Sequence, residues 1–235
     1  MPARLPDNPK FYQKRFMPMR HARLFPWLLA LALPVTVLAN PYERQLANGL
    51  RIIVKEDRRA PTVAHMVWYR AGSMDEKNGT TGVAHVLEHM MFKGTPAAGP
   101  GEFNRRVAAA GGRDNAFTSR DYTAYFQQVP KHKLSDMMQL EADRMRHLTL
   151  DSGEFAQEIR VVMEERRLRT EDQPQALLFE QLMATALQAH PYRVPIIGWM
   201  NDLENMTATD ARAWYESWYV PNNAYVVVVG DVDHE

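Results

Sequence analysis

Residues 82–92 (GVAHVLEHMMF) constrain the fold of this chain more than any other segment. In an α-helix, at about 100° per residue, His85, Glu88 and His89 fill one arc of about 100°, and every other direction is apolar. A helix that is apolar on nearly all sides is predicted to be buried. Because buried polar groups are almost always satisfied, the three polar side chains need partners inside the protein.

A metal ion is one such partner. Two imidazoles one helical turn apart can bind the same ion, and a carboxylate beside them can hold a water molecule. Zinc accepts histidine and carboxylate ligands, and catalytic zinc sites leave one position for water. The order H-x-x-E-H is the inverzincin signature. The alternative interpretation is a pair of core histidines that are hydrogen-bonded to a nearby glutamate.

Two histidines do not complete a zinc site, so a third ligand is expected elsewhere. A second predicted helix at 152–169 has a polar outward face, and its inward stripe consists of Phe155, Ile159 and Val162. Glu158 and Glu165 lie about 20° apart on the helical wheel, between this stripe and a second apolar pair, Val161 and Leu168. Two carboxylates on the buried side of a helix need a cation or protons.

The alternative for these two carboxylates is a pair of internal salt bridges, for instance to Arg105 or Arg106. Considered alone, that alternative is favoured. The two-histidine helix in the same chain reverses the preference, so the sequence predicts a metal site.

The rest of the chain mixes strand and helix signals. Asn48-Gly49 between two extended runs predicts a β-hairpin. A capping box, Asp151-x-x-Glu154, opens the helix at 152. Strands are expected at 62–69, 121–129 and 225–229, and further helices at 131–148, 174–188 and 210–218. The strand at 62–69 is expected to be well buried, and the β-branched run at 225–229 to be central in its sheet.

Four ordered segments resemble the M16 family of zinc metallopeptidases, the relatives of pitrilysin, insulin-degrading enzyme and mitochondrial processing peptidase. Residues 82–95 resemble the zinc-binding helix of that family, and residues 115–126 (NAFTSRDYTAYF) its substrate-side strand. Residues 158–174 resemble the helix that bears the distal glutamate, and residues 190–199 are a further match. The resemblance begins near residue 42, and its order and separations argue against coincidence.

By this resemblance, His85, His89 and Glu165 would be the ligands of one Zn²⁺ ion per chain. Glu88 would be the general base that activates the zinc-bound water. Glu158 would be a second acidic residue of the catalytic site, close to the metal but not a ligand. The helical wheel agrees with Glu165 rather than its neighbour, because residue 164 falls on the solvent face.

The resemblance also implies a way to bind substrate. Asn115 and Ala116 would lie on an edge strand and pair with the backbone of a peptide, which is β-augmentation. The alternative for Asn115 is a simple turn residue after Gly111-Gly112.

The fold that the resemblance implies is α+β, with a largely antiparallel β-sheet and helices packed mainly on one face. The zinc-binding helix would lie against the helix that carries Glu165. Family members pair two homologous halves, and residues 40–235 resemble only the first, the N-terminal catalytic half. We therefore expect a second M16-like half or a partner subunit, and weak or absent activity without it.

Two functions follow from these expectations. The first is a zinc-dependent metalloendopeptidase that hydrolyses oligopeptides or unfolded segments through a glutamate-activated, zinc-bound water. The second is a non-catalytic or partner-dependent subunit of the same fold that binds peptides, or an inactive fragment. The intact set of His85, Glu88, His89 and Glu165 favours the enzyme.

The N-terminus differs in kind from the rest. Residues 1–39 carry six basic side chains and one acidic side chain, a net charge of +5, and the remainder carries −5. The uncharged apolar run at 24–39 follows the basic stretch and predicts a signal peptide or leader, hence export, most simply to a bacterial periplasm. The alternative is an uncleaved leader that anchors the protein to a membrane.

The absence of cysteine excludes disulfides and thiolate zinc sites, and the overall charge of zero gives no reason to expect nucleic acid.

Overall fold

Six strands form one sheet in the order β1-β2-β6-β3-β5-β4 within residues 41–234, the part of the chain that this computed structural model describes. The predicted leader at 1–39 lies outside the described residues. The strands are β1 (Tyr42–Gln45), β2 (Arg51–Glu56), β3 (Thr62–Tyr69), β4 (Arg113–Thr118), β5 (Thr123–Pro130) and β6 (Ala224–Gly230). Only β2 and β6 pair in parallel; every other neighbouring pair is antiparallel. The expectation of a largely antiparallel sheet is therefore confirmed.

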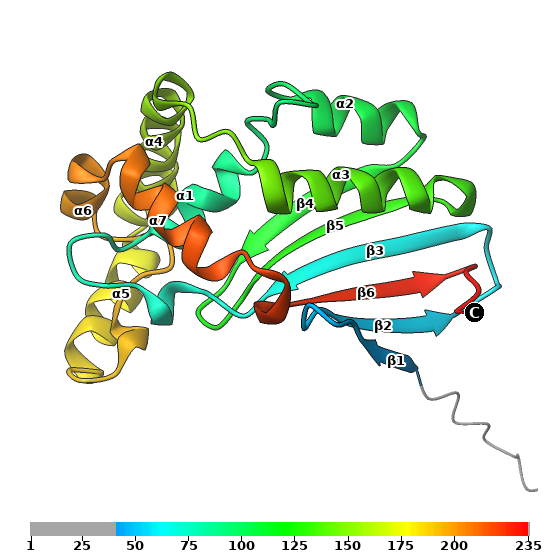
Figure 1. Cartoon of the computed structure of the whole chain (residues 1–235). Coiled ribbons are helices and arrows are strands. Elements are labelled where there is room, and N and C mark those ends of the chain that lie inside the picture. Colours follow the sequence, from blue (N-terminus) through cyan, green and yellow to red (C-terminus); the bar gives the residue numbers. More distant parts are fainter. Residues whose placement is uncertain (1–40, 235) are drawn as a thin grey trace, which may run out of the picture. The chain divides into compact units, whose positions relative to one another are not determined.

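Helices lie over one face of this sheet, which confirms the α+β prediction (Figure 1). They are α1 (Val83–Met90), α2 (Glu102–Ala109), α3 (Leu134–His147), α4 (Ser152–Arg166), α5 (Pro174–Ala186), α6 (Met200–Asn205) and α7 (Ala208–Trp218). Short 3₁₀ turns occur at Ser73–Asp75, Lys131–Lys133, Pro191–Arg193 and Pro221–Asn223, and a π-helical turn, Arg167–Glu171, follows α4. Within the described residues, no helix combines the length and the apolar character that a membrane span requires.

The one-sided arrangement shows in the burial of the strands. Buried and half-buried residues alternate along β3 and along β6, with the buried ones facing the helices. The expectation that 62–69 is well buried therefore holds for one face only. On the other face Trp68 packs against Tyr225 and Phe117, with ring centroids 6.3 and 5.5 Å apart. The expected central position of the 225–229 run is confirmed, because β6 lies between β2 and β3.

The hairpin predicted at Asn48-Gly49 joins β1 to β2. Gly49 adopts φ +89°, a left-handed conformation that favours glycine, and its Cβ, if present, would lie 2.6 Å from Cβ of Asn222. The Asn48 side chain accepts a hydrogen bond from the backbone N–H of Leu50 at 3.1 Å. Local turn chemistry thus fixes this end of the sheet.

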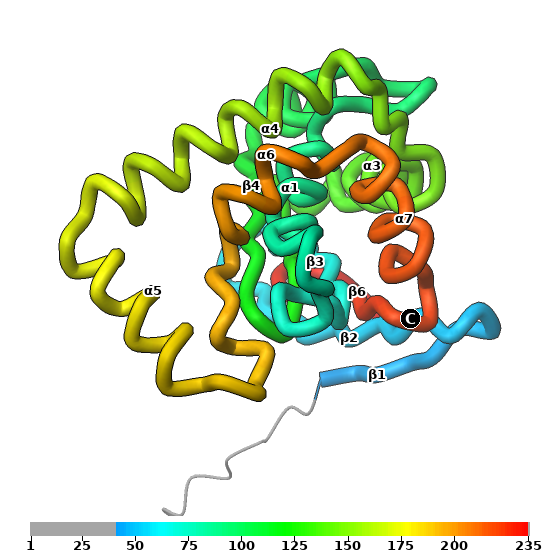
Figure 2. The backbone as a smooth tube through the Cα atoms, turned by 90° about the vertical axis from the view of Figure 1, so that its left-hand side faces the viewer, coloured from blue at the N-terminus to red at the C-terminus, as the bar shows by residue number. Residues whose placement is uncertain are grey.

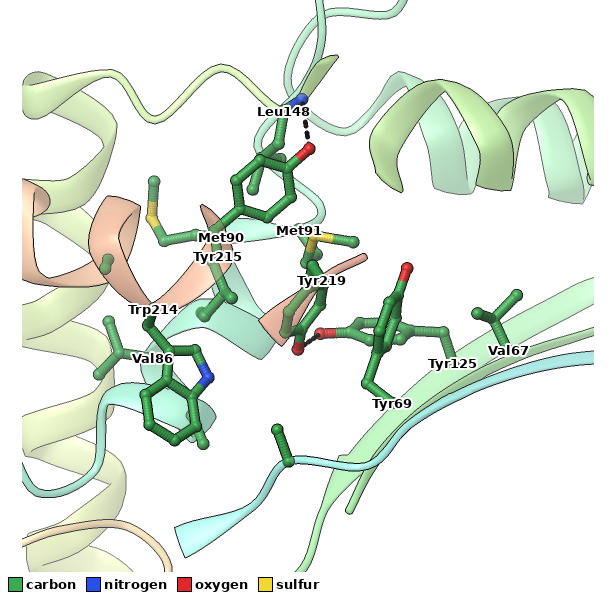
Figure 3. Packing of buried hydrophobic residues seen from close by; sticks show 14 of the residues in the cluster. Val67, Tyr69, Val86, Met90, Met91, Tyr125, Leu148, Trp214, Tyr215 and Tyr219 are labelled. Carbon is green, nitrogen blue, oxygen red and sulfur yellow. Dashed lines mark hydrogen bonds between the residues drawn. The ribbon is translucent and has the colours of Figure 1, made fainter. Parts of the chain in front are cut away.

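Helix α1 is buried as its sequence predicts, and it packs against α4 and α7. Figure 3 shows Val86 and Met90 of α1 close to aromatic side chains of α7. In the same core the hydroxyl groups of Tyr125 and Tyr219 are 2.8 Å apart, which satisfies two buried polar atoms. The two-histidine segment is therefore surrounded by a hydrophobic core.

Helix α4 begins where its cap predicts. The Asp151 carboxylate accepts hydrogen bonds from the backbone N–H groups of Gly153 and Glu154 at 2.8 and 3.0 Å. One expectation from the helical wheel is wrong: the second apolar pair, Val161 and Leu168, is 50% and 58% exposed. A wheel gives directions, but the neighbouring elements decide how much of the helix they cover.

Candidate metal centre

The start of α1 is held from several sides. Gly82 precedes the helix with φ +88°, and a Cβ there would lie 2.5 Å from the carbonyl oxygen of Ile197. The Glu76 carboxylate accepts hydrogen bonds from the backbone N–H groups of Gly82 and Ala84 at 2.8 and 2.9 Å. These two bonds satisfy N–H groups at the start of the helix that have no partner within it. The position of the histidine face is thereby fixed.

Three predicted ligands converge beside this face. The Nε2 atom of His89 lies 3.4 Å from Glu165 Oε2, and Nε2 of His85 lies 3.8 Å from Glu165 Oε1. One ligand atom from each of the three residues lies within 4.8 Å of the others. Tetrahedral zinc, with bonds of about 2.0–2.2 Å, separates its ligand atoms by roughly 3.3 Å. The donor set and its spacing therefore fit a zinc ion without a large rearrangement.

The His85 imidazole is prepared for such an ion by its surroundings. Burial lowers its pKa to about 3, and the neighbouring His89 and Arg169 lower it in the same direction. A neutral imidazole is the form that binds a metal. Within residues 41–234, the buried Nδ1 atom of His85 has no hydrogen-bond partner.

The ring of His89 is held from its other side by Glu158. Its Nδ1 atom lies 3.0 Å from Glu158 Oε1, and Nζ of Lys93 lies 2.5 Å from Glu158 Oε2. The hydrogen bond with His89, together with Lys93, holds the pKa of Glu158 below its usual range. A carboxylate on Nδ1 orients a histidine so that Nε2 faces the metal. Glu158 thus lies close to the predicted ligands without being one of them.

The alternative of two ion pairs holds in part: Glu158 pairs with Lys93 and Glu165 with Arg169, but the partners named as examples are wrong. Arg105 and Arg106 both pair with Glu102 on α2. Glu165 instead pairs with Arg169, whose Nη1 atom lies 2.5 Å from Oε1. Glu164, one residue earlier, is exposed, as the helical wheel predicts, and it pairs with Arg167.

Glu88 lies next to the ligand group and is half-buried. Burial raises its pKa, against a hydrogen bond that the Thr118 hydroxyl donates to its Oε2 atom. A raised pKa makes the carboxylate a stronger base, which suits a group that accepts and then releases a proton.

Asn115 and Ala116 lie on β4, the last strand of the sheet, as predicted. Both line a cleft of about 650 Å³ that also contains His85, Glu88 and Glu165. The far wall of this cleft comes from α5 and the segment 192–197. Figure 2 shows α4 running outward to a turn, after which α5 and the segment that follows it lead back toward β4. The cleft is therefore open along an unpaired strand edge within the described sheet.

Sequence reasoning missed several contacts of this site. Lys93 follows His89 by four positions, and Arg169 follows Glu165 by four positions. Residues four apart on a helix are neighbours, so this spacing could have predicted both contacts. Thr118 shares a strand face with Ala116, since alternate residues of a strand point the same way. No comparable local signal points to Glu76.

Comparisons with known proteins bear on the family. A model of the insulinase family of peptidases, family M16, matches residues 51–198, and a model of the M16 inactive domain matches residues 205–235. The zinc protease PqqE of Helicobacter pylori is 39% identical over 191 residues, which are 81% of this chain and 43% of that protein. The probable mitochondrial-processing peptidase subunit beta of Arabidopsis thaliana is 30% identical over 201 residues, 85% of this chain and 38% of that protein.

Solved structures agree with these matches. The crystal structure of a protease from Helicobacter pylori is 38% identical with a TM-score of 0.81, covering 84% of this chain and 48% of that one. The periplasmic protease PqqL from Escherichia coli is 28% identical with a TM-score of 0.76, covering 83% of this chain and 22% of that one. The chain spans less than half the length of each of these relatives.

Proposed function

Because this chain belongs to the insulinase family of peptidases, family M16, we propose that it is a zinc-dependent metalloendopeptidase or the catalytic half of one. The observation that carries the proposal is the convergence of His85, His89 and Glu165 beside a half-buried glutamate, Glu88. Relatives described as zinc proteases support the same activity.

In this proposal His85 and His89, through Nε2, and Glu165 hold one zinc ion per chain. When bound, zinc lowers the pKa of water and polarises the carbonyl of the scissile peptide bond. Glu88 accepts a proton from the attacking water and delivers it to the leaving amine. Thr118 occupies Oε2 of Glu88 with its hydroxyl, which leaves Oε1 for that proton.

Glu158 and the edge strand complete the assignment. Glu158 acts in the catalytic site by orienting His89, supported by the ion pair with Lys93.

Asn115 and Ala116 lie on β4, whose outer edge is unpaired within the described sheet, and an extended peptide can add there as a further strand. Since only extended backbone pairs in this way, the substrates are oligopeptides or unfolded segments.

Export and a second half belong to the same proposal. The Escherichia coli relative is described as periplasmic. We propose that residues 1–39 are a signal peptide, or a membrane anchor if uncleaved, and that residues 40–235 form the peptidase domain. A second M16-like half or a partner subunit would cover the open cleft, since relatives include a subunit beta and a protease solved as its first half.

A non-catalytic, peptide-binding subunit is the second candidate. It is favoured by the match of residues 205–235 to the M16 inactive domain. Glu88→Gln separates the two candidates, because the variant keeps all three predicted ligands.

The assay is cleavage of a quenched fluorescent, unstructured peptide by the zinc-loaded chain. We expect Glu88→Gln to bind the same amount of zinc as the parent and to lose at least about a hundredfold in kcat/KM. Glu164→Gln, on the solvent face of α4, is the matched control and should retain the parent activity. A rate that is measurable in the parent and unchanged in Glu88→Gln contradicts the enzyme proposal, whereas a parent without activity is the result expected of a catalytic half that lacks its partner.

A further inference from the structure

The cleft beside the candidate metal centre contains two arginines without a carboxylate partner. Arg120 and Arg193 both line it, and neither forms an ion pair within residues 41–234. Three other charged groups of the lining already have ionic partners, and Glu88 accepts a hydrogen bond from the Thr118 hydroxyl. Glu165 pairs with Arg169, and Glu180 accepts hydrogen bonds from Arg166 at 2.9 Å through both of its oxygens.

Arg120 is held in place rather than free in solvent. It lies in the turn between β4 and β5, two residues after Thr118, and its guanidinium carbon is 5.3 Å from the centroid of the Tyr192 ring. The Tyr192 hydroxyl donates to both carboxylate oxygens of Asp121 at 2.6 and 2.7 Å. Asp121 therefore fixes the ring on which the guanidinium rests, and a cation over an aromatic face is attracted to it.

One hydrogen-bond donor of Arg120 is unpaired in the described structure. Its Nε–H is buried without a hydrogen-bond partner among the described residues. A buried donor left unpaired is costly, and such a group in a native structure needs an explanation, such as a bound water, an ion or a ligand. A guanidinium presents its N–H groups as a planar fork that matches a carboxylate.

We infer that Arg120, assisted by Arg193, binds a carboxylate of the substrate, so that the cleft selects peptides with a glutamate or aspartate near the scissile bond. This inference rests on the proposed function, since it names the substrate class of the same cleft. A side chain and the free C-terminus of a short peptide offer the same chemistry, and the experiment separates them.

The test measures binding, so that it does not depend on turnover. The Glu88→Gln variant of residues 1–235, loaded with zinc, is titrated into fluorescein-labelled peptides, and binding is followed by fluorescence anisotropy. The peptides are amidated decamers without other charged residues. One set carries Glu at a single position, which is moved along the peptide, and the second set carries Gln at the same positions. A third set carries Gln and has a free C-terminal carboxylate.

We expect a Glu peptide to bind about tenfold more tightly than its Gln twin at low salt, at one or two neighbouring positions. The preference should shrink as salt rises, because the cleft is open to solvent. Arg120→Gln should bring the ratio close to one, and Arg193→Gln should reduce it in part. Arg160→Gln, an exposed arginine on α4, is the control and should leave the ratio unchanged.

The outcomes are distinct. A preference confined to the free C-terminus supports the carboxylate site and assigns it to terminal recognition. Equal binding of Glu and Gln peptides, or a preference that survives Arg120→Gln, overturns the inference and leaves the proposed peptidase standing. Failure of every peptide to bind contradicts both the inference and the peptide-binding part of the proposed function.

Discussion

His89 and Glu158 meet at 3.0 Å between Nδ1 and Oε1, on the side of the imidazole that faces away from Glu165. The same carboxylate forms an ion pair with Lys93, so the residue that orients the His89 ring is itself fixed by Lys93. Its Nε2 atom is left pointing at the Glu165 carboxylate. The orientation of one predicted ligand thus depends on residues that do not touch the metal position.

We predict that Glu158→Gln weakens zinc binding about 10- to 100-fold, which is the usual effect of losing a partner behind a metal-binding histidine. Zinc affinity is measured by competition with a fluorescent chelator. Lys93→Met should give a smaller loss, because it removes only the support of Glu158. Unchanged affinity in Glu158→Gln would show that the carboxylate does not position His89.

Glu76 gives a pH-dependent prediction. Burial raises its pKa to about 8, although the amides of Gly82 and Ala84 lower it, and Asp75 and Asp202 raise it further. The ordinary value of 4.5 applies to the unfolded chain. Between these values the folded state binds more protons, so the free energy of unfolding falls as pH rises from about 4.5 to about 8.

Glu76→Gln removes this titration. The difference in unfolding free energy between the parent and Glu76→Gln should therefore decrease as pH rises through that window. Urea unfolding in the presence of a chelator measures it without a contribution from metal. A difference that stays constant with pH would mean that Glu76 is ionised throughout, as its two amide contacts alone suggest.

The buried pair of Arg144 and Glu141 gives a prediction about stability. Arg144 is 2% exposed, donates to Glu141 from Nε at 2.7 Å, and lies over the ring of Phe103 at 3.9 Å. Arg144→Met should cost about 3–5 kcal/mol in unfolding free energy, because it leaves a buried carboxylate without its cation. Adding Glu141→Gln to the same chain should recover part of that loss.

Urea unfolding of the apo protein checks this pair. Arg146→Met, on the exposed side of the same helix, is the control and should change the stability by less than about 0.5 kcal/mol. A loss of similar size in both variants would contradict the assignment of a buried ion pair.

Periodicity made the central elements predictable. The apolar surroundings of His85 and His89 require a buried helix, and the wheel position of Glu165 places its carboxylate inward. Both features are local, because the residues that define them lie within a few turns of one helix. The edge position of Asn115 and Ala116 came from resemblance, and β4 is the last strand of the described sheet.

What the sequence could not reveal depends on contacts between distant segments. Val161 and Leu168 have the same spacing as buried residues, yet no element covers them enough to bury them. The Arg120–Tyr192 contact joins residues 72 positions apart, and neither has a local pattern that names the other. Likewise, the sequence around Arg144 does not distinguish it from an exposed helical arginine. It is buried because the sheet and α2 pack around it.

Zinc content of the purified chain, residues 1–235, measured by mass spectrometry beside His85→Ala, tests the central claim most directly. Glu165→Gln and Glu164→Gln form a matched pair on the same helix. We predict one zinc per chain in the parent and in Glu164→Gln, and little or none in His85→Ala and Glu165→Gln. A folded parent without zinc, or equal zinc in all four proteins, would contradict the assignment of His85, His89 and Glu165 as a metal centre.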